Sequence, residues 1–387
     1  MVKQNPSIFF TLLFTAFLCA CGGQESTEQN KQVSTMKILA GTYTQGKSEG
    51  IYQLSFDPGT GALTNEGLAV KTEQPSFLIA PKGRDIVYAV DETDRFNEEP
   101  GGGVSAFRWD ESKRQLTLVN SQNTGGAHPC YLSLSEDGRF LSVANYTGGN
   151  FAVFGLSANG ELIKDPQLRQ HEGSGPNANR QEAPHAHCST WRPDGKYLYV
   201  VDLGIDEVVA YPFGQSNGTL GDRATAIKVA AGSGPRLLTF HPTQKLAFLV
   251  NELSCTVLSM SYETDSPVFS PIQEESTLPA GFSGENTCAH IQLSPDGRFL
   301  YVSNRGHDSI AAYAVSPDGK LERVEIEPTL GQHPRFFTIT PDGRYLLVAN
   351  RDSDSVVVFR IDQVSGQLEP TGIQAEVFSP VCLQLVD

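Results

Sequence analysis

The stretch CAHIQLSPDGRFLYVSNR, residues 288–305, decides the fold because its pattern recurs along the chain. It joins two short apolar runs through a Pro-Asp-Gly turn and ends in Asn-Arg, which is typical of a β-hairpin. The spacing between copies, roughly 45 to 57 residues, is typical of propeller blades. The turns of the six copies are centred on Lys82, Asp137, Asp194, Thr243, Asp296 and Asp342.

Each hairpin is followed by two further strand-like runs, and four short antiparallel strands make one propeller blade. The chain ends carry half-repeats: 380–385 resembles a first strand without a turn, and 37–42 resembles a second strand without a first. Joining them removes the edges that an open array would expose. The sequence therefore predicts an all-β, seven-bladed β-propeller over residues 36–387, with four antiparallel strands per blade. Both termini share the closing blade, which places Leu383 beside Leu39.

The N-terminus has the pattern of an export signal. Lys3 precedes an apolar run, 8–18, that is too short to span a bilayer. The run ends in Leu18-Cys19-Ala20-Cys21-Gly22, which resembles the lipobox of bacterial lipoproteins. In this interpretation residues 1–20 are a signal peptide, Cys21 is lipidated, and residues 21–35 form a flexible tether. We therefore expect an exported protein, lipid-anchored at the cell envelope. An ordinary cleaved signal with incidental cysteines is the alternative.

The net charge and the cysteine content narrow the range of possible binding partners and bound groups. A formal net charge of -15 argues against nucleic acid, which needs a basic footprint. No CxxC spacing occurs, so free thiols are expected rather than a zinc site or a disulfide framework. The predicted partner is a small molecule; the membrane is contacted only through the lipid, no cofactor is expected, and the protein is expected to be a monomer. The cysteines beyond the signal are Cys130, Cys188, Cys255, Cys288 and Cys382.

Hairpin geometry gathers the candidate functional residues. The residues just before a first strand and just after a second strand share the end opposite the turn, and seven blades bring these ends around one channel mouth. Recurring Pro and Asn are structural, whereas ionisable residues that vary between blades are candidates for function. They are His185, His187, Arg236, His290 and Arg335 before first strands, and Glu92, Glu252, Arg305 and Arg351 after second strands.

These residue types suit small-anion chemistry. Arginine binds carboxylate or phosphate bidentately, and a histidine or glutamate with a pKa near neutrality can move a proton to or from water. The alternative is a ring of interblade ion pairs that only closes the propeller.

Three other motifs are weaker. Gly46-Lys47-Ser48-Glu49-Gly50 matches the letters of the serine-hydrolase elbow, but it joins two strands rather than a strand and a helix. His185, His187 and His290 could share a metal, although no carboxylate pattern accompanies them, so no metal site is predicted. Gly101-Gly102-Gly103 opens no helix, which disfavours a phosphate-binding loop.

Several motifs along nearly the whole mature length resemble one family. They are Gly41-Thr42-Tyr43-Thr44 with Gly50-Ile51-Tyr52, Pro184-His185-Ala186-His187 before a Pro-Asp-Gly turn, and Ser303-Asn304-Arg305-Gly306. In these the chain is similar to the seven-bladed propeller lactonases typified by bacterial 6-phosphogluconolactonase, with fungal carboxy-muconate cyclases as relatives. The type enzyme acts on a cytosolic sugar phosphate, whereas this chain carries an export signal. The resemblance therefore indicates lactone chemistry more than that particular substrate.

The resemblance implies metal-independent hydrolysis of a lactone of a sugar acid or related small acid. The cluster proposed as the family's active site matches His187, Arg236, Glu252 and Arg305. We expect Glu252 or His187 to activate water and Arg236 or Arg305 to stabilise the oxyanion. The remaining arginine would hold a substrate carboxylate or phosphate. Further substrate contacts are expected from His185, His290, Arg335, Asn251 and Asn304.

Two other functions stay open. The same groups could close a lactone ring, as in a cycloisomerase. A non-catalytic propeller could instead bind a glycan or a protein, but such a mouth would more often present aromatic platforms. Tyr146 is the only aromatic residue among the second-strand ends, and the frequent charges there favour chemistry.

Overall fold

The computed structural model describes residues 1–2, 7 and 35–386. The lipobox-like stretch with Cys21, and the tether up to residue 34, lie outside the described residues. The described residues contain no helix that is long and apolar enough to cross a membrane.

The described chain from Met36 onward forms seven antiparallel sheets built in the same way. First strands are β4 (Leu78–Ile79), β10 (Pro129–Leu134), β14 (Ala186–Trp191), β19 (Pro235–Phe240), β23 (Thr287–Leu293), β27 (Pro334–Ile339) and β31 (Pro380–Val386). Second strands are β5 (Ile86–Asp91), β11 (Phe140–Asn145), β15 (Tyr197–Asp202), β20 (Leu246–Asn251), β24 (Phe299–Arg305), β28 (Tyr345–Asn350) and β1 (Met36–Thr42).

The outer half of each sheet follows in chain order. Third strands are β8 (Gly103–Asp110), β12 (Asn150–Gly155), β16 (Glu207–Gly214), β21 (Thr256–Tyr262), β25 (Ser309–Val315), β29 (Ser355–Ile361) and β2 (Gly50–Phe56). Fourth strands are β9 (Gln115–Asn123), β13 (Gln167–Gln170), β18 (Ala224–Lys228), β22 (Phe269–Ser276), β26 (Leu321–Pro328), β30 (Leu368–Glu376) and β3 (Leu63–Lys71). Additions are β17 (Thr219–Leu220), which pairs with β16, and the hairpin of β6 (Arg95–Phe96) and β7 (Glu99–Pro100).

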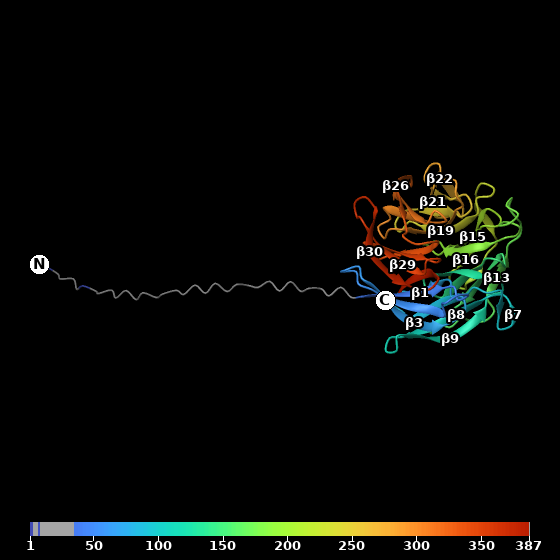
Figure 1. Cartoon of the computed structure of the whole chain (residues 1–387), viewed down its shortest axis with the longest axis horizontal. Helices are drawn as coiled ribbons and strands as arrows, with labels where there is room; N and C mark the ends of the chain where they lie inside the picture. The colour runs from blue at the N-terminus through green and yellow to red at the C-terminus, as the bar shows by residue number, and fades with distance from the viewer. Residues whose placement is uncertain (3–6, 8–34, 387) are drawn as a thin grey trace. The chain divides into compact units, whose positions relative to one another are not determined.

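The closing blade joins the two ends of residues 36–386, as the half-repeats predict. Its strand order is β3-β2-β1-β31, with β31 in the first-strand position. Ala40 pairs with Leu383 and Leu39 with Gln384, one residue from the expected register. Figure 1 shows the C-terminus beside β1. The seven-bladed all-β architecture is therefore confirmed.

Burial follows strand position within a blade. Every residue of β20, β24 and β28 is buried, because these second strands have packed sheets on both faces. The fourth strands β22 and β26 are mostly exposed or half-buried beyond their first residue, since one edge and one face meet solvent. The apolar core thus lies between neighbouring blades, and the polar strand ends remain free to form a site.

The Pro-Asp-Gly turns are held by their own side chains. Asp296 accepts hydrogen bonds from the Ser294 hydroxyl at 2.6 Å and from the Arg298 backbone at 3.1 Å. Gly297 has φ of +77°, the left-handed region that favours glycine. This local chemistry fixes the hairpin and leaves the opposite strand ends to face the channel mouth.

Candidate active site

Every blade lines a common cavity with residues near the start of its first strand. In five hairpins the pairing between first and second strands slips by one residue there, for example between Pro235 and Leu237. Such a bulge turns a side chain out of the regular alternation. The ring consists of Ser76, Cys130, His187, Arg236, His290, Arg335 and Val381.

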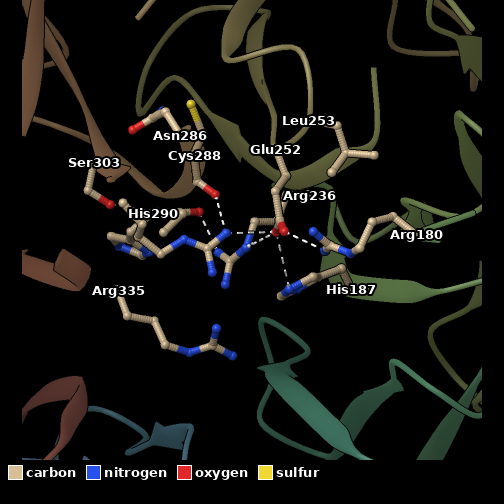
Figure 2. A network of polar contacts seen from close by, with 12 residues as sticks. Arg180, His187, Arg236, Glu252, Leu253, Asn286, Cys288, His290, Ser303 and Arg335 are labelled. Atoms are coloured by element: carbon tan, nitrogen blue, oxygen red, sulfur yellow. Dashed lines mark hydrogen bonds and ion pairs between the residues drawn. The ribbon is translucent and has the colours of Figure 1, made fainter. Parts of the chain in front are cut away.

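Glu252, which follows β20, is the centre of the polar cluster at this mouth (Figure 2). Its Oε2 lies 2.9 Å from Arg236 Nε, 3.0 Å from Arg305 Nη2 and 4.0 Å from His187 Nε2. Its Oε1 accepts a 2.6 Å hydrogen bond from Arg180 Nη2. The structure therefore brings His187, Arg236, Glu252 and Arg305 together and adds Arg180, which the sequence analysis missed.

The arginines are held by backbone carbonyl groups as well as by Glu252. Arg305 Nη2 donates to the Cys288 carbonyl oxygen at 2.7 Å, and Arg236 Nη1 donates to the Ala289 carbonyl oxygen. The Nε atoms of both arginines are buried without a hydrogen-bond partner of good geometry among the described residues. Glu252 and the backbone carbonyl groups together therefore fix the two guanidinium groups in place.

Electrostatics keep Glu252 ionised. Burial favours its neutral form, but Arg305 and Arg236, followed by His187 and Arg180, outweigh burial and hold the pKa of Glu252 far below its usual value. Burial and the neighbouring Arg305 and Arg335 in turn lower the pKa of Arg236 to about 10. A carboxylate with so low a pKa is a weak proton acceptor.

The two ring histidines are neutral at pH 7. Burial and the charge of Arg236 lower the pKa of His187 well below its usual value and that of His290 to about 3. His187 lies near the Cys130 thiol, with 3.7 Å between Nδ1 and Sγ, and its other nitrogen faces Glu252. His290 packs on Phe336, and its Nδ1 is buried without a partner among the described residues.

The opposite side of the cavity carries a second, looser ion pair. Arg335 Nη2 lies 4.0 Å from Glu92 Oε2, and Glu92 accepts a hydrogen bond from the Tyr43 hydroxyl at 3.1 Å. The Arg335 guanidinium stands 5.3 Å from the centre of the Tyr43 ring. Among residues 35–386 no hydrogen bond reaches the Arg335 side chain, so this cation is available to an anionic ligand.

Arg180 reaches Glu252 from the connection between β13 and β14. Its guanidinium also donates to the Tyr146 hydroxyl at 3.2 Å, and its side chain is 36% exposed. Residues 171–185 form the longest connection between blades. The other connections between blades are shorter, so the length of this loop is the sequence feature that could have pointed to Arg180, since long loops often carry function.

Four other candidates lie outside this cluster. His185 stacks on Tyr146 and its ring contacts Glu182. It therefore packs against the tyrosine that bonds to Arg180. Arg351 pairs with the neighbouring Asp352 at the surface. The side-chain amides of Asn251 and Asn304 donate hydrogen bonds to Thr256 and to the Thr277 carbonyl oxygen, and the Asn251 Oδ1 is buried without a partner among the described residues. Their contact with a substrate stays a prediction.

The weaker motifs have structural places. Ser48 lies between β1 and β2, is buried, and bonds to the Thr42 hydroxyl at 2.6 Å. Within the described part of the chain, no group of three or more His, Cys, Asp or Glu side chains is placed to hold a metal ion.

The family model described as "Lactonase, 7-bladed beta-propeller" matches residues 37–385. The chain belongs to this lactonase family.

Relatives of known name support the assignment to the propeller lactonases. The chain is 35% identical to a 6-phosphogluconolactonase of Bacillus subtilis, over 89% of this chain and 97% of the relative. It is similar to the solved periplasmic gluconolactonase of Pseudomonas aeruginosa, with 36% identity, a TM-score of 0.85, and coverage of 92% of this chain and 99% of the other. A solved Lactobacillus plantarum protein has 33% identity and a TM-score of 0.84, covering 92% and 100%.

Proposed function

We propose that this propeller lactonase hydrolyses the ring ester of a sugar-acid lactone, or of a related small acid, that carries an anionic group. The single observation that carries the proposal is the cluster of His187, Arg236 and Arg305 around buried Glu252, at a cavity to which every blade contributes. The family assignment and the names of the B. subtilis and P. aeruginosa relatives support it.

The charge of the mouth supports an anionic substrate. Four guanidinium groups, those of Arg180, Arg236, Arg305 and Arg335, face two carboxylates, those of Glu252 and Glu92. Both ring histidines are neutral at pH 7, because burial and Arg236 lower their pKa values. A carboxylate or phosphate on the substrate would offset the excess positive charge, and Arg335 is the guanidinium without a hydrogen bond within the described residues.

His187 is the better candidate for the general base. The pKa values of both groups are lowered, but the Glu252 carboxylate is held by three arginines, whereas the neutral imidazole of His187 can take a proton from the water that attacks the lactone carbonyl. Arg236 and Arg305 would stabilise the oxyanion of the tetrahedral intermediate. The protonated His187 would then return the proton to the ring oxygen as the ester bond breaks. Glu252 would orient the arginines and stabilise the imidazolium that forms.

An anionic substrate would also raise the basicity of His187. Arg236 lowers the pKa of this histidine in the free protein, after burial itself. A bound anion opposes that positive charge, so the pKa of His187 should be higher in the complex. The substrate would thereby help to activate the base that attacks it.

The test is a panel of lactones with the purified chain in the presence of a chelator. Hydrolysis yields an acid that releases a proton at neutral pH, so the base that a pH-stat must add measures turnover directly. We expect turnover of δ-lactones of sugar acids, with kcat lowered about 10²-fold or more in His187→Gln and Glu252→Gln. Arg335→Gln should mainly raise KM for an anionic lactone and leave a neutral lactone unaffected.

A matched control separates chemistry from folding. Glu322→Gln makes the same chemical change on the exposed surface of β26 and should keep full activity. Circular dichroism should show that each variant is folded. The hydrolase proposal fails if the wild type turns over no lactone above background, or if Glu252→Gln and His187→Gln are both fully active. Binding of sugar acids without turnover would then favour the binding-propeller alternative.

We also propose that the protein is exported and anchored through a lipid on Cys21, a residue outside the described part of the chain. The lipobox-like sequence Leu18 to Gly22 supports this, and the P. aeruginosa relative is described as periplasmic. Metabolic labelling with a fatty-acid analogue in a bacterial host should label the wild type and not Cys21→Ser. An unlabelled wild type that is secreted in soluble form would contradict the anchor.

A further inference from the structure

Two cysteines from neighbouring blades meet directly behind Glu252. Cys255 stands in the turn between β20 and β21, and Cys288 lies in β23. The Cys255 sulfur accepts a hydrogen bond from the Asn286 amide at 3.3 Å, and that amide also donates to Asn304 Oδ1 at 3.2 Å. The Cys288 thiol donates to the same Asn304 oxygen at 3.4 Å. Each thiol also lies close enough to the other to shift its pKa, lowering that of Cys255 and raising that of Cys288.

Comparison of the blades shows that this pair is an exception in the repeat. The position of Cys255 is occupied by aspartate in three other blades. There the aspartate accepts a backbone N–H of the next blade, one residue before the position equivalent to Cys288. These contacts join Asp206 to Gly234 at 2.8 Å, Asp308 to His333 at 2.9 Å and Asp354 to Ser379 at 2.8 Å.

The scaffold therefore needs a contact between blades at this place, and aspartate supplies it. Cys255 keeps the left-handed backbone of those aspartates, with φ of +55° beside +56° at Asp206. At Cys255 the contact with the next blade runs between the sulfur and Asn286, so the scaffold does not need a second thiol at Cys288. The pair of cysteines adds redox chemistry.

We propose that Cys255 and Cys288 are a redox-sensitive dithiol that forms a disulfide between two blades and lowers the activity of the adjoining site. Cys255 is the thiol that reacts first: it is 7% exposed, whereas Cys288 is 0% exposed. Hydrogen bonds from Cys288 and then from Asn286 lower the pKa of Cys255 despite burial, which favours its reactive thiolate.

The oxidation balances with a peroxide as oxidant. The Cys255 thiolate attacks one oxygen of hydrogen peroxide, the O–O bond breaks, and a sulfenic acid and hydroxide form. The Cys288 sulfur then displaces the sulfenic oxygen, which leaves as water together with the thiol proton. In total two thiols lose two electrons and two protons, and one peroxide becomes two waters. A soluble dithiol reverses the reaction by thiol–disulfide exchange.

The backbone of Cys288 connects this chemistry to the site. Its N–H donates to the Glu252 carbonyl oxygen at 3.1 Å, and its own carbonyl accepts from Arg305 at 2.7 Å. Figure 2 shows Cys288 and Asn286 next to the arginine–glutamate cluster. Drawing the two sulfurs into a covalent bond moves this strand start, and displacements of about 1 Å can cost about 10²-fold in rate.

The decisive experiment maps thiols in the full chain before and after treatment with hydrogen peroxide at neutral pH. After alkylation and proteolysis, mass spectrometry should find the Cys255 and Cys288 peptides joined, about 2 Da lighter than their sum because each thiol has lost one hydrogen. Dithiothreitol should restore both free thiols. Cys255→Ser should lack the joined peptide, whereas Cys382→Ser, a buried thiol in the closing blade, should retain it.

Activity is the second readout, and it alone rests on the proposed function. The lactonase rate should fall about tenfold or more on oxidation, recover with dithiothreitol, and become insensitive to peroxide in Cys255→Ser. If the wild-type map shows both thiols still free, or Cys255 over-oxidised without pairing, the dithiol proposal is wrong. If the disulfide forms but the rate is unchanged, the proposed effect on the site is overturned. If the reduced protein hydrolyses no lactone, the proposed function fails while the peptide map still decides the disulfide.

Discussion

At the scale of single residues, Glu252 organises the mouth rather than serving as its base. Each of its carboxylate oxygens has its own partners: Arg180 on Oε1, and Arg236 and Arg305 on Oε2. A buried carboxylate with three cations is difficult to protonate, and its removal leaves buried guanidinium groups unpaired. We expect Glu252→Gln to cost about 3–5 kcal/mol of stability in addition to its kinetic effect.

The buried histidines make stability depend on pH. Burial lowers the pKa of His290 to about 3, against about 6.5 in the unfolded chain. Below pH 6.5 the unfolded state therefore binds a proton that the folded state excludes, and stability falls as pH falls. His187 acts in the same direction. Asp91 acts oppositely between about pH 4 and 6, because burial raises its pKa to about 6.

We expect His290→Gln to reduce this pH dependence by about 1.4 kcal/mol per pH unit between pH 6 and 5, the contribution of one proton. Urea unfolding at several pH values measures the slope. Phe336→Leu is the matched control: it removes the tilted ring whose centre lies 3.9 Å from that of His290 without removing a titrating group. It should lower stability equally at each pH. An unchanged slope in His290→Gln would contradict the assignment of a neutral buried His290.

At the scale of elements, the connection 171–185 completes the site. Gln181, next to Arg180, is fully buried and donates to the Leu203 carbonyl oxygen at 2.9 Å and to Asp206 Oδ1 at 2.8 Å. These bonds attach the loop to the turn after β15 and hold Arg180 toward Glu252. Gln181 is thus a positioning residue that acts through Arg180.

We expect Arg180→Ala and Gln181→Ala to lower kcat/KM by similar factors, about tenfold, which corresponds to about 1.4 kcal/mol. Because both residues act through one contact, the kcat/KM of the double variant should be no lower than that of the less active single variant. Gln215→Ala, which loses a bond to the Asp194 carbonyl oxygen at the turn end of the blades, is the control and should keep its activity. Additive losses in the double variant would show that Gln181 acts independently of Arg180.

At the scale of the whole propeller, closure depends on β31. This strand pairs with β1, at the opposite end of residues 36–386. The ring is therefore closed by a pairing between two strands that no loop connects. Leu383 is 2% exposed and packs in the cluster that includes Ile38, Leu54 and Leu347. Loss of this packing weakens closure for every blade.

We expect Leu383→Ala to lower the free energy of unfolding by about 2–5 kcal/mol, the usual range for a buried leucine. Val364→Ala, at a side chain that is 87% exposed, should change it by less than about 0.5 kcal/mol. Urea denaturation followed by fluorescence measures both. Coincident unfolding curves for the two variants would show that the closing blade does not limit stability.

The sequence by itself determined the blade architecture and the gathering of the charged strand ends. Hairpins, turns and their period are encoded in short windows, because alternating burial and turn chemistry act between neighbouring residues. The half-repeats at 37–42 and 380–385 were sufficient to predict the closing blade. The same reasoning brought His187, Arg236, Glu252 and Arg305 to one end of the channel, since a hairpin has only two ends.

Only the tertiary structure decided which of these side chains touch. The slip in register that turns His187 and Arg236 into the cavity depends on how first and second strands pair. Arg180 comes from a loop without periodic pattern and meets Glu252 across 72 positions of the chain. The amides of Asn251 and Asn304 donate hydrogen bonds to threonines, although they stand beside functional candidates. Side-chain direction and long-range contacts are set by packing between blades, which no local pattern records.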